Sequence, residues 1–120
     1  MFGQMMTLPL AIPSLIRHAD RWHGMTEIVT RLPEGGIHRQ TWSETHRRAR
    51  RLASALGSLG VAPGDRVATL AWNTHRHVEI YYAVSGSAAV CHTVNPRLFP
   101  DQIAWIINDA EAGYVFFDVT

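Results

Sequence analysis

Three apolar segments that alternate with two amphipathic ones constrain the fold of this chain more than any other feature of its sequence. Residues 66–72, 88–94 and 114–119 are β-prone runs with few polar positions, the pattern of strands that are covered on both faces. Residues 74–84 and 100–112 carry apolar side chains at helical spacing. Strand–helix–strand–helix–strand at this spacing predicts right-handed crossovers and a parallel sheet, and therefore an α/β fold.

The sequence before the first of these strands predicts a small antiparallel addition. Residues 26–31 and 37–42 are two further β-prone runs, and they flank a turn at 33–36 that contains one proline and two glycines. This arrangement is typical of a β-hairpin. Residues 14–23 precede it and have the apolar spacing of a short amphipathic helix.

A longer helix is predicted between the hairpin and the first strand, from residue 43 to residue 59. Ser43 is a suitable N-cap, and Gly60 ends the helix. The stripe expected to face the core consists of Ala49, Leu52, Ala53, Leu56 and Leu59. The arginines on the other faces predict a solvated surface rather than a phosphate or nucleic-acid site; they are Arg47, Arg48, Arg50 and Arg51.

The last predicted strand ends beside residue 120, where a doubly wound sheet would continue into its next helix. Three parallel strands with few helices would leave apolar strand surface uncovered. We therefore expect residues 14–120 to be part of a doubly wound parallel sheet, an incomplete subdomain with a small antiparallel hairpin near its start.

Composition excludes several classes of function. The chain has 11 basic and 10 acidic residues, a balance that argues against a dedicated nucleic-acid-binding protein. All 11 basic residues are arginines, so these 120 residues supply neither a P-loop lysine nor a Schiff-base lysine. Cys91 is the single cysteine, which we interpret as a small buried apolar side chain in a reducing, cytoplasmic protein.

The apolar start of the chain predicts neither a signal peptide nor a membrane span. Residues 1–16 lack a basic segment at their start and are interrupted by Pro9 and Pro13.

Polar residues follow the predicted strands at their carboxyl ends, where ligands bind in open α/β sheets. His92 and Asp118 could be proposed there as a base and its orienting partner. We favour the interpretation that His92 and Thr93 hydrogen-bond loop backbone and that Asn95 shapes the turn before Pro96.

Histidine pairs elsewhere do not predict a metal site. His75 and His77 are two residues apart on a predicted helix and point to different sides, unlike the i, i+4 pair that binds zinc. We expect both to be surface histidines, as we do His18 and His23. No acidic pair is spaced for general acid–base catalysis, and no G-x-G-x-x-G segment follows a strand.

Several segments together resemble the N-terminal region of the fatty-acyl-CoA synthetases, in the adenylate-forming (AMP-binding) superfamily. The resemblance covers nearly all of the chain from about Leu15. It rests on ARRLASAL at 49–56, GVAPGDRVAT at 60–69, NTHRHVEIY at 73–81, HTVNPRL at 92–98 and QIAWIINDAE at 102–111. The G-x-x-P-G-D-R-V segment is typical of the whole superfamily, whereas H-T-x-N-P-R-L resembles its medium- and long-chain fatty-acyl branch.

The resemblance implies a two-step ligase. ATP and a fatty acid would give an acyl-adenylate and pyrophosphate with Mg²⁺, and CoA would then displace AMP. The family's phosphate loop, acidic motifs and catalytic lysine have no counterpart in these residues. No catalytic residue, cofactor-binding residue or metal ligand of the family can therefore be carried over, and we expect the chain itself to be structural and inactive.

Residues 1–13 form a separate expected unit, an apolar arm interrupted by proline. In some members of the resembled family, the first residues reach across to a partner subunit. The resemblance thus implies a homodimer contact for this arm.

Two other functions are compatible with the fold. The chain could be a non-catalytic interaction module derived from the same subdomain, but an isolated module should protect the edge of its sheet. It could also be a small nucleotide-binding domain, but no phosphate loop is present.

Overall fold

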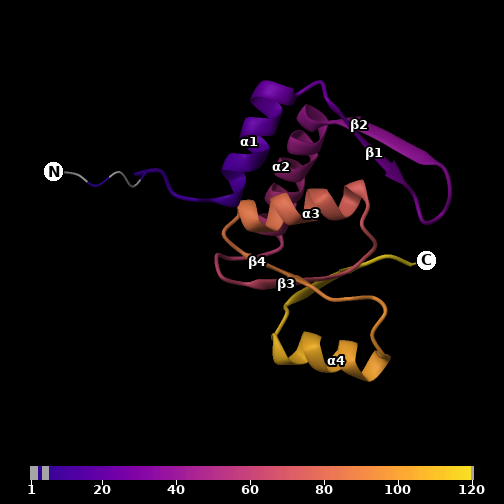
Figure 1. Cartoon of the computed structure of the whole chain (residues 1–120). Coiled ribbons are helices and arrows are strands. Elements are labelled where there is room, and N and C mark those ends of the chain that lie inside the picture. The colour runs from indigo at the N-terminus through magenta and orange to yellow at the C-terminus, as the bar shows by residue number, and fades with distance from the viewer. Residues whose placement is uncertain (1–2, 4–5, 120) are drawn as a thin grey trace.

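The computed structural model describes residue 3 and residues 6–119, which form four helices and five strands (Figure 1). In chain order these are α1 (Ile12–His23), β1 (Glu27–Arg31), β2 (Ile37–Thr41), α2 (Trp42–Ser58), β3 (Arg66–Leu70), α3 (His75–Gly86), β4 (Val90–Thr93), α4 (Pro100–Asp109) and β5 (Tyr114–Phe117). None of the helices in this part of the chain is both long and apolar enough to cross a lipid bilayer.

The predicted α/β architecture is confirmed. β3, β4 and β5 form a parallel sheet in the order β4-β3-β5, and Val67 of β3 lies opposite Cys91 and Tyr114. β1 and β2 pair antiparallel from Glu27 opposite Thr41 to Arg31 opposite Ile37. Their turn needs its two glycines, because φ is +99° and +85° at positions 35 and 36, values that other residues rarely adopt.

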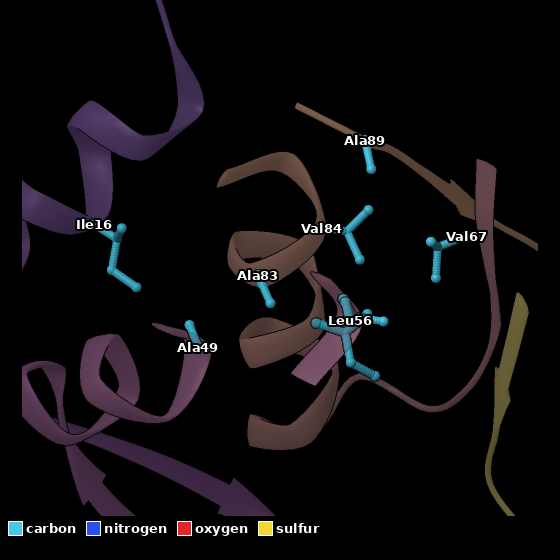
Figure 2. Close-up of a cluster of buried hydrophobic side chains, with 8 residues drawn as sticks. Ile16, Ala49, Leu56, Val67, Ala83, Val84 and Ala89 are labelled. Carbon is cyan, nitrogen blue, oxygen red and sulfur yellow. The ribbon is translucent and has the colours of Figure 1, made fainter. Parts of the chain in front are cut away.

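Helices cover the two faces of the parallel sheet unequally. In Figure 1, α3 lies on one side of β3 and β4, with α1 and α2 beyond it, whereas α4 lies on the other side. The buried core occupies the first side and consists mainly of Ile16, Ala49, Leu56, Val67, Ala83, Val84 and Ala89 (Figure 2). On the α4 side, apolar strand residues stay partly exposed, as expected from the sequence; Val90 is 49 % and Phe117 63 % exposed.

The predicted bounds of the four helices are corrected by one to three residues. The N-cap of α2 is Thr41, not Ser43, and Thr41 Oγ1 accepts a hydrogen bond from the Glu44 amide at 3.2 Å. Leu59 follows the last helical residue and is exposed, so it is not part of the buried stripe. α1 includes Ile12 and Pro13, and the arm residues 6–11 before it lie away from the rest of the protein (Figure 1).

Ser43 has a different role, in a polar contact that joins α1 to α2. Its Oγ donates a hydrogen bond to Asp20 Oδ1 at 2.5 Å, and Asp20 Oδ2 lies 2.7 Å from His46 Nδ1. Gly24 allows this approach, because a Cβ there would lie 2.5 Å from both the Asp20 carbonyl oxygen and Ser43 Oγ. The hydrogen bonds from Ser43 and His46 lower the pKa of Asp20 below its usual 3.8.

Replacing Asp20 with Asn should lower the free energy of unfolding by about 1 kcal/mol at pH 6, a modest loss because the Asp20 side chain is 36 % exposed and water weakens its interactions. Because the folded state lowers the pKa of Asp20, this stabilisation is present above about pH 3.8 and is lost as pH falls through the lower, folded-state value.

Urea unfolding from pH 6 to pH 2 measures both the loss of stability in the Asn variant and its dependence on pH. The matched control is Asp109→Asn, an exposed site; an equal loss in both variants would contradict the assignment.

Candidate functional site

The main crevice lies where the chain leaves β3 and β4. The connection from β3 leads to α3 on one face of the sheet, and the connection from the neighbouring β4 leads to α4 on the opposite face (Figure 1). Adjacent strands whose connections diverge in this way open a crevice at their carboxyl ends. Residues 71–73 and 93–97, with His77 and Tyr81, line a cavity of about 420 Å³ at this position.

His77 is the most constrained polar group of the crevice. Its Nε2 shares a hydrogen bond of 2.9 Å with Thr69 Oγ1 of β3, and its ring stacks on Tyr81 with centroids 4.6 Å apart. Thr69 is fully buried, and burial lowers the pKa of His77 below its usual 6.5, so the ring is neutral at pH 7.

The expectation that His75 and His77 are surface histidines is wrong. Both are 5 % exposed, because α3 lies between the hairpin and α2 on one side and the sheet on the other. The two rings do point to different sides of the helix, but each of those sides is covered. His18 and His23 of α1, in contrast, are exposed as predicted. Among the residues that the structure describes, no three His, Cys, Asp or Glu side chains gather as metal ligands do.

The segment 92–98 turns the chain from β4 towards α4. Asn95 Oδ1 accepts a hydrogen bond from the Arg97 amide at 2.9 Å, and the Leu98 amide reaches the Asn95 carbonyl at 3.3 Å. Asn95 therefore shapes the turn around Pro96, as predicted. The expected hydrogen bonds from His92 and Thr93 side chains to loop backbone are not found within residues 6–119.

His92 and Asp118 do not form a base and its partner. His92 belongs to β4 and Asp118 follows β5. These two strands pair with opposite edges of β3, so β3 lies between the two residues. Asp118 Oδ2 instead accepts a hydrogen bond from the Trp72 amide at 2.8 Å, which joins the end of β5 to the end of β3.

The other candidate groups have structural roles. Cys91 is half-buried against the core, and burial raises the pKa of its thiol, as for a small apolar side chain. The arginines of α2 are exposed as predicted, and Arg48 also pairs with the buried Glu79 at 2.7 Å.

The lining of the crevice shows no reactive pair. It holds no carboxylate and no thiol; it offers the exposed Arg97 guanidinium, the Asn73 amide and the edges of aromatic rings. Sequence reasoning expected polar groups at the carboxyl ends of the strands from His92 to Asn95 and at Asp118. Of these, Thr93 and Asn95 line the crevice, whereas His92 and Asp118 do not, and His77 and Tyr81 were missed. Their i, i+4 spacing on a helix was the available signal, since it places both on one face.

Comparison with known proteins agrees with the fold and with the motifs. The family model described as AMP-binding enzyme matches residues 15–120. The chain belongs to the AMP-binding enzyme family.

Relatives within this family are acyl-CoA ligases. The chain is 58 % identical over all 120 residues to the 3-methylmercaptopropionyl-CoA ligase of Ruegeria lacuscaerulensis, and 54 % identical over 120 residues to the medium-chain-fatty-acid–CoA ligase of Ectopseudomonas oleovorans. It covers 22 % of each of these proteins, so the chain spans about a fifth of the length of the curated relatives it matches.

The fold has a matching counterpart among solved structures. The fatty acyl CoA synthetase of Mycobacterium tuberculosis superposes with a TM-score of 0.73 at 24 % identity, over 89 % of this chain and 21 % of that one. This likeness concerns the fold alone.

The Thr69–His77 hydrogen bond should stabilise the crevice measurably. Thr69→Val keeps the shape of the side chain but removes the hydroxyl, leaving His77 Nε2 buried without its partner; we expect a loss of about 1–3 kcal/mol in the free energy of unfolding. Urea unfolding at pH 7.5 measures it.

Thr93→Val is the matched control for this experiment. Thr93 lies directly opposite Thr69 on β4, has the same strand preference and is exposed, so its replacement should change stability by less than about 0.5 kcal/mol. Equal losses for the two variants would show that the hydrogen bond contributes nothing of its own.

Proposed function

We propose that this chain forms the N-terminal subdomain of an ATP-dependent fatty-acyl-CoA ligase. The enzyme would activate a medium- or long-chain fatty acid as its acyl-adenylate and transfer the acyl group to CoA. The observation that carries this proposal is the 58 % identity, over all 120 residues, to a protein named as an acyl-CoA ligase.

The contribution that we assign to these residues is structural. Adenylate formation needs a cradle for the triphosphate, Mg²⁺ to balance its charge and a cation at the transition state. These 120 residues hold no lysine and no Ser/Thr/Gly-rich phosphate loop, and their crevice has no acid–base pair. In our proposal the remaining parts of the enzyme supply those groups, and this chain supplies a sheet, its helices and a crevice against which they are arranged.

We also propose that the enzyme works in the cytoplasm. The single thiol, Cys91, is half-buried and reduced, and no disulfide within the chain is possible with one cysteine.

A chimera tests the proposed function. The residues of the Ruegeria lacuscaerulensis ligase that match this chain are replaced by residues 1–120, and acyl-CoA formation from ATP, CoA, Mg²⁺ and acids of increasing length is measured. We expect kcat within about tenfold of the unmodified ligase, because 58 % identity should preserve the packing against the rest of the enzyme.

Two controls accompany the chimera. The 120-residue chain alone should give no acyl-CoA, and the ligase without the matched residues should also be inactive. A folded chimera without activity would contradict the proposal, and so would turnover by the isolated chain.

We further propose that the arm takes part in a homodimer. Met6, Leu8 and Leu10 are 61–87 % exposed and lie away from the rest of the protein, so apolar surface is available there for a partner subunit.

Deleting residues 1–10 from the chimera tests the arm and leaves α1 with its N-cap, Ala11. Light scattering should then detect monomer where the undeleted chimera is a dimer. The matched control is Leu59→Ser, which removes an equally exposed leucine outside the arm and should leave the dimer unchanged. A dimer that survives the deletion would refute the role of the arm.

A further inference from the structure

The β1–β2 hairpin is docked on α3 by three polar contacts in a row. At its turn, Glu34 pairs with Arg76. In the middle of β2, the His38 ring lies on the His75 ring. Two residues further along β2, Gln40 Nε2 donates a hydrogen bond to Glu79 Oε1 at 3.0 Å. The hairpin does not pair with the parallel sheet, so these contacts are a main part of its attachment.

The central contact is a close stack of two imidazoles. The ring centroids of His38 and His75 are 3.7 Å apart and the planes differ by 21°. His75 is 5 % exposed, and its Nδ1 has no hydrogen-bond partner. His38 is half-buried, with Nε2 3.0 Å from Gln40 Oε1. A neutral His75 ring fits this arrangement, whereas a charge on His75 would face an imidazole at van der Waals distance in a place that water barely reaches.

The charges around His75 come from every element packed against it. Burial contributes most to lowering its pKa below the usual 6.5, followed by His38; among the other neighbours, the cations lower it and a carboxylate raises it. These neighbours are Arg76 and Glu79 on α3, Arg48 on α2 and Glu34 in the hairpin turn.

We propose that the His38–His75 stack is a proton-sensitive latch, which holds the hairpin on α3 while the buried His75 ring is neutral and releases it when that ring takes up a proton. The outer contact at the turn does not respond in the same pH range. The hydrogen bond from Arg76 lowers the pKa of Glu34 below 4.5, so that ion pair persists well below pH 6.

The direction of the pH effect follows from linkage. An exposed histidine binds a proton near pH 6.5, whereas His75 in the docked state binds it only at lower pH. The undocked state therefore gains protons first as pH falls from 7.5 to 5.5, and the docked state loses population. Because α3 also carries His77 and Tyr81, release of the hairpin loosens the helix that lines the crevice.

Hydrogen exchange of the hairpin amides tests the latch. Exchange at residues 27–31 and 37–41 of the 120-residue chain is measured at pH 7.5 and pH 5.5, each corrected for the intrinsic exchange rate. We expect the corrected rate to rise about threefold or more at pH 5.5, because protonation of His75 then favours the undocked state.

Two variants and a control isolate the ring pair. His75→Phe keeps an aromatic ring in the stack but removes the group that binds the proton, and His38→Phe keeps the stack but removes a neighbour that lowers the pKa of His75. The pH-dependent rise should therefore shrink in both. His18→Gln removes an exposed histidine of α1 and should leave the rise unchanged. If one Phe variant fails to fold, the other still decides the question.

The proposal is overturned if the wild-type hairpin exchanges equally at the two pH values, or if both Phe variants keep the full rise. The second result would assign the effect to another group, such as the buried His77, which lies on the side of α3 that faces the sheet.

Discussion

β3 is paired on both edges and covered on both faces, and the rest of the structure is arranged around it. Val67, Ala68 and Thr69 have no exposed surface. Val67 faces the core of α2 and α3, whereas Ala68 faces the α4 side, so one strand joins the two halves of the protein. A substitution in β3 would therefore disturb both layers, and the strand offers no exposed position at its centre.

The central position of β3 also determines where a crevice can form. The chain leaves β3 for one face and β4 for the other, and the ends of the two strands remain open between the diverging connections. The side chain that contacts β3 from within this crevice is His77, bound to Thr69. The same buried hydrogen bond thus joins the central strand to the lining of the crevice.

Much of the fold could be predicted from periodicity, because apolar spacing reports directly which face of an element is covered. The hairpin, the three parallel strands and all four helices were predicted within a few residues of their observed bounds. The N-cap of α2 was mispredicted because Thr41 and Ser43 are both good N-caps and lie two residues apart. In the structure Thr41 caps the helix, and Ser43 donates a hydrogen bond to Asp20. Burial of the histidines was missed because His75, Glu79 and Gln40 look like surface residues until α3 is placed between two layers. Such burial depends on contacts between distant segments, which no single window of sequence contains.

The segment 92–98 shows why a specific sequence does not need to be a reactive one. Its position at the carboxyl end of a parallel strand suits a catalytic group, yet the side chain that the structure shows hydrogen-bonded in it, Asn95, serves the backbone. Asn95 holds the Arg97 amide, and the buried Val94 is fixed by the hydrogen bond from its amide to the Thr69 carbonyl at 2.8 Å. This turn must carry the chain from one face of the sheet to the other within the few residues between β4 and α4. A short reversal next to a buried strand tolerates few residue types, because proline restricts the backbone and the asparagine side chain must replace a missing backbone partner. The geometry of the crossover is therefore sufficient to account for the Asn95–Pro96 pair in this segment.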